Sequence, residues 1–175
     1  MVNQLTIDRH KAAVLIMDYQ NRTLNELSEE HQKDILGKVN AILSKARDHK
    51  IPVIYIEGRR GERTPETEIH PAVTPKPGEV VLTKKRVGPF TTTNLNEVLN
   101  KLGIDMLILM GIATSGCVLT TVRCAADLDY KLAVISDCCV NPRDPEVHRF
   151  LVEKIFPNQA SVITSHEILE ALGNS

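Results

Sequence analysis

Short apolar runs, separated by stretches in which apolar residues recur at helical spacing, are the feature of this 175-residue chain that most limits its fold. A run of about four to six such residues indicates a strand buried on both faces, as in a parallel sheet. The expected strands span residues 12–17, 53–56, 80–83, 106–110, 132–136 and 161–163. Because helical patterns alternate with these runs, we expect a parallel sheet with helices on both faces.

The fold class that follows is α/β, a three-layer α/β/α, Rossmann-like arrangement with a six-stranded, mostly parallel sheet. Capping signals mark the helix starts: Ser28, Asn94 with Glu97 three residues on, Asp144–Pro145, and Ser165. The expected helices cover residues 29–49, 94–103, 145–155 and 165–173, and a further helix begins at Cys117.

Two segments lack a regular pattern. Residues 21–28 are polar and are expected to form a loop. Residues 57–79 are rich in Gly, Pro, Glu and Arg and are too long for a plain connection. We interpret them as a functional flap or a contact loop.

Length and composition indicate a single globular domain over residues 1–175. The formal net charge is −1 and the only dense basic block is 84–86, which disfavours nucleic acid or an anionic membrane as partner. No apolar run reaches membrane-spanning length and the N-terminus does not read as a signal peptide, so a cytoplasmic location is expected. The cysteines lack zinc-ligand spacing and are expected to be free thiols.

Three polar residues fall at the carboxyl ends of expected strands, where parallel sheets bind ligands: Asp18, Lys84 and Cys117. A thiol can act as nucleophile, a carboxylate can accept its proton and later donate one, and an ammonium can stabilise the thiolate. The dipole of a helix beginning at Cys117 would also favour the thiolate. Structural interpretations stay open: a turn cap for Asp18, a solvated lysine for Lys84 and an ordinary buried cysteine for Cys117.

Three motifs carry a resemblance to a known family: residues 14–20 (VLIMDYQ), 83–90 (TKKRVGPF) and 111–118 (GIATSGCV). In this order they resemble the isochorismatase-like cysteine hydrolases, which include nicotinamidases, N-carbamoylsarcosine amidase and ureidoacrylate-type amidohydrolases. The resemblance implies catalytic roles for Asp18, Lys84 and Cys117, a small-molecule substrate and a homo-oligomer, a dimer or larger. Spacing to Phe90 favours Lys84 over Lys85, and in a strand the two side chains point in opposite directions.

The same resemblance implies a cis peptide bond between Ile112 and Ala113 and an oxyanion hole made by the N–H groups of Ala113 and Cys117. Candidate substrate contacts lie within or beside the motifs, at Gln20, Asn21, Phe90 and Thr114. Nicotinamidases of this family carry an Asp-x-His metal site after the second strand, whereas residues 57–61 here read EGRRG. We therefore expect no metal and no cofactor, and nicotinamide is disfavoured as substrate.

Three functions remain open on the sequence alone. The first is a cysteine-dependent hydrolase of a small amide, ureido or related C–N substrate, acting through a covalent thioester. The second is vinyl-ether hydrolysis of the isochorismatase type, with Asp18 as general acid and Cys117 dispensable. The third is a small-molecule binding or scaffold protein of the same fold with no catalytic activity.

Overall fold

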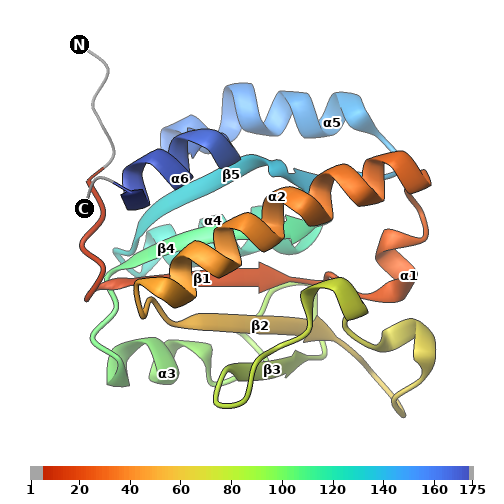
Figure 1. The fold of residues 1–175 in the computed structure, drawn as a ribbon, viewed down its shortest axis with the longest axis horizontal. Helices are drawn as coiled ribbons and strands as arrows, with labels where there is room; N and C mark the ends of the chain where they lie inside the picture. Colours follow the sequence, from red (N-terminus) through yellow and green to blue (C-terminus); the bar gives the residue numbers. More distant parts are fainter. Residues whose placement is uncertain (1–5, 174–175) are drawn as a thin grey trace.

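The structure, a computed structural model, describes residues 6–173, and these form three layers around one sheet (Figure 1). All five strand pairings are parallel, in the order β3-β2-β1-β4-β5-β6. The strands are β1 Ala12–Met17, β2 Val53–Gly58, β3 Val80–Lys84, β4 Met106–Ile112, β5 Lys131–Val140 and β6 Ser161–Ile163. This confirms the expected fold class. The outermost residues of the expected domain, 1–5 and 174–175, lie outside the described part.

Helices cover both faces of the sheet, which explains why its strands are apolar on both sides. The helices are α1 Asn21–Leu24, α2 Glu29–Asp48, α3 Leu95–Lys101, α4 Leu119–Asp127, α5 Pro145–Phe150 and α6 Ser165–Gly173. Alternate residues of β1 serve the two cores: Val14 and Ile16 lie in the cluster with α2 and α6, and Ala13 and Leu15 in the one with α3 and α4. No helix within residues 6–173 is long and apolar enough to cross a membrane.

Two of the expected helix caps are confirmed. The Ser28 side chain accepts a hydrogen bond from the His31 N–H at 3.3 Å. The Asp144 carboxylate accepts from the N–H groups of Glu146 and Val147, both at 3.1 Å. Each side chain pairs backbone donors that the helix itself leaves free.

Two other caps were predicted wrongly. Asn94 makes no capping bond, and the Thr93 hydroxyl accepts from the Leu95 N–H instead, at 3.1 Å. At α6 the capping box is formed by Thr164 and Glu167, one residue before the predicted Ser165. In both cases the residue just upstream also carries a capping hydroxyl, so residue type alone did not distinguish the two.

Ser165 instead contacts Asp137, which lies inside β5, although the expected strand ended at residue 136. The Asp137 carboxylate accepts from the Ser165 N–H and hydroxyl, both at 2.7 Å. Strand β5 runs on to Val140 past an irregularity in its pairing with β4. Asp137 therefore anchors the start of α6.

The two segments expected to be loops are partly structured. Residues 21–24 form the short helix α1, which contradicts the expected loop. Between β2 and β3, residues 59–79 contain two short 3₁₀ turns, Pro65–Thr67 and Pro71–Val73. We call residues 59–79 the flap segment.

A bidentate ion pair holds the end of the flap segment against the core. Arg47 of α2 donates from Nε to Glu79 Oε1 at 2.7 Å and from Nη2 to Oε2 at 2.9 Å. Burial raises the pKa of Glu79, but the hydrogen bonds from Arg47 and from the Lys76 N–H outweigh it, and the net shift is downward. The pair therefore stabilises the fold while Glu79 is ionised.

We predict that Glu79→Gln lowers the free energy of unfolding by about 2 kcal/mol at pH 7, because hydrogen bonds to a charged group are lost. A depressed folded-state pKa contributes stability above the ordinary glutamate value of 4.5, and the contribution disappears as pH falls through the folded-state value. Urea unfolding at pH 7 and pH 3.5 measures both effects. The exposed Glu62→Gln in the same segment is the control. If Glu79→Gln lowered the free energy of unfolding equally at both pH values, the stabilisation would not depend on an ionised Glu79, which would contradict this account.

Candidate active site

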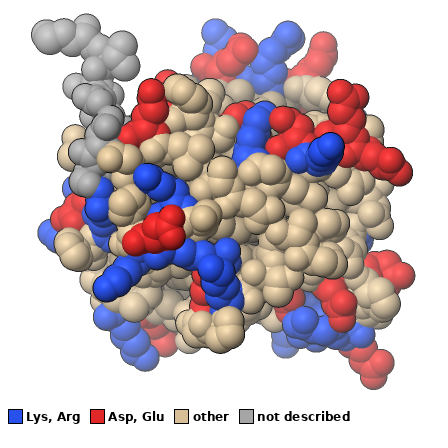
Figure 2. Space-filling view, in the orientation of Figure 1, with Lys and Arg blue, Asp and Glu red and all other residues tan. Residues whose placement is uncertain are grey.

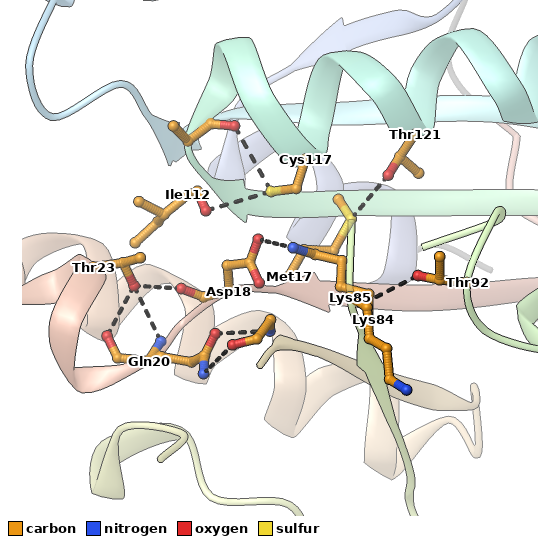
Figure 3. Close-up of polar contacts among 12 residues, drawn as sticks. Met17, Asp18, Gln20, Thr23, Lys84, Lys85, Thr92, Ile112, Cys117 and Thr121 are labelled. Carbon is orange, nitrogen blue, oxygen red and sulfur yellow. Dashed lines mark hydrogen bonds and ion pairs between the residues drawn. The ribbon is translucent and has the colours of Figure 1, made fainter. Parts of the chain in front are cut away.

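Asp18, Lys84 and Cys117 meet at the carboxyl edge of the sheet (Figure 3). Asp18 follows β1 and Cys117 follows β4, and these strands are neighbours at the point where the strand order reverses. Lys84 ends β3, two strands away, and reaches across the end of β2, so that its Nζ lies 2.8 Å from Asp18 Oδ2. Both residues of this ion pair are buried, with 7% and 6% of Asp18 and Lys84 exposed.

The structure distinguishes Lys84 from its neighbour Lys85. Lys84 points toward Asp18, whereas the Lys85 side chain is exposed and leads away from it (Figure 3). The Lys85 backbone N–H donates to the Thr92 hydroxyl at 3.1 Å. The opposite directions of the two side chains are those expected from strand alternation, and the lysine at the site is the one that the spacing to Phe90 favoured.

Gly58, the last residue of β2, makes room for the pair. A Cβ atom there would lie 3.1 Å from each of three polar atoms: Asp18 Oδ1, Lys84 Nζ and Arg22 Nη2. Arg22 also donates to the Gly58 carbonyl at 2.6 Å. A single glycine at a strand end carries no signal of its own, so this packing could not be predicted from the sequence.

The Asp18 backbone is held in the left-handed region, at φ 57°, which non-glycine residues rarely adopt. Its N–H donates to the Ile56 carbonyl at 2.8 Å, and its carbonyl accepts from the Thr23 hydroxyl. While Oδ2 bonds Lys84, Oδ1 is buried and has no hydrogen-bond partner among the described residues. One carboxylate oxygen is thus left available to take a proton.

Cys117 does not lie in the first turn of an α-helix, as the sequence had predicted. A turn of π-helix, Thr114–Val118, joins β4 to α4, which begins at Leu119. The Cys117 thiol contacts the carbonyl oxygens of Ile112 and Ala113 at 3.4 and 3.7 Å, and the peptide bond between those two residues is cis.

Burial dominates the electrostatics of the site. It raises the pKa of the Cys117 thiol well above its ordinary value, the charge of Asp18 adds to the shift, and Lys84 opposes it. Burial also raises the pKa of Asp18, against the attraction of Lys84. The expectation that a helix dipole favours the thiolate is therefore wrong for the resting protein, because the thiol is 2% exposed and faces a carboxylate. The resting site holds a thiol beside an acceptor of raised basicity.

Gln20 and Asn21, two of the expected substrate contacts, bind the flap segment in this structure. The buried Gln20 amide accepts from the Gly58 N–H at 2.9 Å and donates to the carbonyls of Gly58 and Thr67. Asn21 Nδ2 donates to the Pro65 carbonyl at 2.7 Å. Their polar atoms hold the flap segment beside Asp18 rather than facing Cys117.

The other two expected contacts, Phe90 and Thr114, have partners in different elements. The Phe90 ring packs against Tyr130, with 6.2 Å between ring centroids. Tyr130 precedes β5 and so lies toward the sheet edge opposite Cys117. Thr114, three residues before Cys117, shares a hydrogen bond of 2.8 Å with Nδ1 of His148.

Side chains from α5 and the end of β5 support the loop that carries Cys117. Besides the bond from His148, the Ser115 hydroxyl donates to Asn141 Oδ1 at 2.6 Å. Burial, and then the charge of His31, lowers the pKa of His148, so this imidazole is neutral at neutral pH. The sequence carries no signal for the bond between Thr114 and His148, because it joins segments 34 residues apart.

Within residues 6–173 no group of three or more His, Cys, Asp or Glu side chains is arranged to hold a metal ion. The polar groups at this edge are a thiol, a carboxylate and several cations. Their arrangement suits acid–base and nucleophilic chemistry on a small molecule.

The chain is a three-layer α/β/α protein with a buried thiol and an ion pair at the switch point of its sheet. This combination of fold and site is that of an α/β hydrolytic enzyme. The sequence pattern of the isochorismatase domain matches residues 12–167, and the chain belongs to the isochorismatase family. It is an isochorismatase-family hydrolase.

Individual relatives agree with this assignment. The chain is 30% identical to YwoC, an uncharacterized isochorismatase family protein of Bacillus subtilis, over 97% of this chain and 98% of that protein. It is 31% identical to maleamate amidohydrolase of Pseudomonas putida over 58% of this chain and 47% of that enzyme. An isochorismatase family protein from Burkholderia thailandensis has a similar structure, with a TM-score of 0.82, 26% identity, and coverage of 96% and 98% of the two chains.

We predict that Gly58→Ala lowers activity at least tenfold, because its Cβ would push apart the Asp18 and Lys84 side chains. Gly61→Ala is the matched control, since no atom lies within 4 Å of a Cβ built there. Steady-state kinetics measure the loss, and thermal unfolding shows whether the fold is retained. Equal activity of the two variants would show that the close packing at Gly58 is not needed.

Proposed function

We propose that this protein is a cysteine-dependent hydrolase of a small substrate with an amide, ureido or related C–N bond. The observation that carries the proposal is the Asp18 carboxylate, buried beside the Cys117 thiol and paired with Lys84 through one oxygen only, Oδ2, while Oδ1 has no hydrogen-bond partner among the described residues. The likeness to an enzyme named maleamate amidohydrolase supports amide chemistry.

In the first half of the reaction, Asp18 takes the thiol proton as the Cys117 sulfur attacks the substrate carbonyl carbon. A carboxylate with a raised pKa is a better proton acceptor than an exposed one, and Lys84 keeps it oriented. The N–H groups of Ala113 and Cys117 stabilise the tetrahedral oxyanion. Asp18 then gives the proton to the departing nitrogen as the C–N bond breaks, which leaves a thioester on Cys117.

In the second half, water attacks the thioester carbonyl and loses a proton to Asp18. The C–S bond breaks, the Cys117 sulfur regains the proton, and the carboxylic acid leaves. The original thiol proton leaves with the amine, and water supplies the proton that sulfur regains. The site therefore returns to its starting state, and neither an oxidant nor a cofactor is consumed.

Vinyl-ether hydrolysis is the second candidate, favoured by the raised pKa of Asp18, which suits a general acid. That chemistry needs no nucleophile. The contact between the buried thiol and the carboxylate is unused in it, which is why we place it second.

We predict that Cys117→Ala lowers hydrolysis of small amides by at least about a thousandfold, as removal of a nucleophile does in other hydrolases. Cys124→Ala, at a half-buried position on α4, should keep wild-type activity. The assay compares a panel of small primary amides and ureido acids with isochorismate. A Cys117→Ala variant that still hydrolyses its substrate would refute the thioester route, and activity on isochorismate alone would establish the second candidate.

A further inference from the structure

A cavity of about 390 Å³ opens beside the Asp18–Lys84 pair, within the size range of small-molecule sites. It is lined by Arg22, Gly58, Arg59, Arg60, Lys84, Lys85, Arg86 and Val87. The lining thus contains six cationic residues and no acidic one. Gly58 connects the cavity to the site, since its Cα carries no side chain between the cavity and Asp18 Oδ1.

Within the described part of the chain, only two of these cations are paired with a carboxylate. Lys84 pairs with Asp18, and Arg59 lies 3.6 Å from Glu57 Oε1. Among residues 6–173, the Arg60 side chain donates only to the Lys85 carbonyl, and that of Arg22 only to the Gly58 carbonyl and the Gln20 amide. The cavity therefore holds positive charge that the protein itself does not neutralise.

Arg86 is the clearest case. It is exposed, and among the described residues its guanidinium has neither a hydrogen bond nor an ion pair. Arg22 comes to the same cavity from α1, and its Nη2 would lie 3.1 Å from a Cβ at Gly58. Two guanidinium groups from separate elements thus border one opening, and a guanidinium is suited to bidentate binding of an oxyanion.

This concentration of charge is local. The chain has a net charge of −1, and on the face shown in Figure 2 basic and acidic residues are interspersed. A focused positive potential at the mouth of one cavity raises the local concentration of small anions, whereas a wide basic face would suit a polyanion.

We infer that the substrate carries an anionic oxygen group, which Arg22 and Arg86 bind while the scissile C–N bond lies at Cys117. This inference rests on the proposed function and narrows its substrate class to amides or ureido compounds that bear an oxyanion. The same chemistry could recognise a carboxylate or a phosphate, and the experiment below separates the two.

The test is the relative rate at which anionic iodoacetate and neutral iodoacetamide alkylate Cys117, each divided by the rate at Cys124. Peptide mass mapping reads both cysteines in the same sample. In the wild type, Cys117 should prefer iodoacetate over iodoacetamide more strongly than Cys124 does. Arg22→Gln and Arg86→Gln should each lower this preference about tenfold, the effect of one unit charge a few ångströms away in a partly screened cavity.

Lys101→Gln is the matched control, because it removes one exposed cation from the end of α3 and should leave the preference unchanged. The inference would be overturned if Cys117 preferred iodoacetate over iodoacetamide no more strongly than Cys124 does. It would also be overturned if Arg22→Gln and Arg86→Gln, like Lys101→Gln, left the preference of Cys117 unchanged. Protection of Cys117 from iodoacetamide by succinate but not by inorganic phosphate would assign a carboxylate, and the reverse a phosphate. Protection by neither would also overturn it.

The alkylation readout needs no turnover, so it separates this inference from the proposed function. A charge preference that depends on Arg22 and Arg86, in a protein that hydrolyses no amide, would sustain the anion site and refute the hydrolase proposal. Amide hydrolysis without that preference would do the opposite. With a substrate in hand, an acid amide and its methyl ester should differ in kcat/KM, and Arg86→Gln should remove that difference.

Discussion

The buried ion pair between Asp18 and Lys84 is the interaction on which the rest of the site depends. Two charges removed from water need close contact and correct geometry to be tolerated, and here their atoms lie 2.8 Å apart. That closeness requires a glycine at position 58 and a left-handed backbone at Asp18, fixed by hydrogen bonds from both sides. The same burial keeps the Cys117 proton on sulfur at rest and makes Asp18 a stronger base. In the reaction we propose, the proton passes from Cys117 to Asp18 only when substrate is bound.

The fold and the three central residues could be predicted because they depend on local pattern and one topological rule. Apolar runs marked the strands, and parallel strands place their carboxyl ends at one edge, where Asp18, Lys84 and Cys117 meet. The state of the thiol could not be predicted, since it depends on how deeply the folded chain buries it. Nor could the sequence predict that Gln20 binds the flap segment, because its amide forms hydrogen bonds with backbone groups 38 and 47 residues away. The cationic cavity joins three segments that share no sequence pattern.

The reacting groups and the cavity cations come from different parts of the chain. The sheet ends hold the reacting groups, and the adjoining segments, α1, the start of the flap segment and residues 85–87, supply the cations that face the cavity. This division is common in α/β proteins, where loops on a fixed scaffold determine which ligand is accepted. Relatives that share the fold can therefore act on different substrates, and in the anion site that we infer, the charge of this cavity is what selects the substrate of this chain.

The most direct test of this account is the titration of the Cys117 thiol, followed by iodoacetamide alkylation against pH in the wild type and two variants. An unperturbed thiol titrates near pH 8.5. The account predicts a wild-type midpoint above that value, a lower midpoint in Asp18→Asn, where the repelling charge is gone, and a higher one in Lys84→Met. A wild-type midpoint well below 8.5 would show a preformed thiolate and would contradict the assignment of Asp18 as the base that removes its proton.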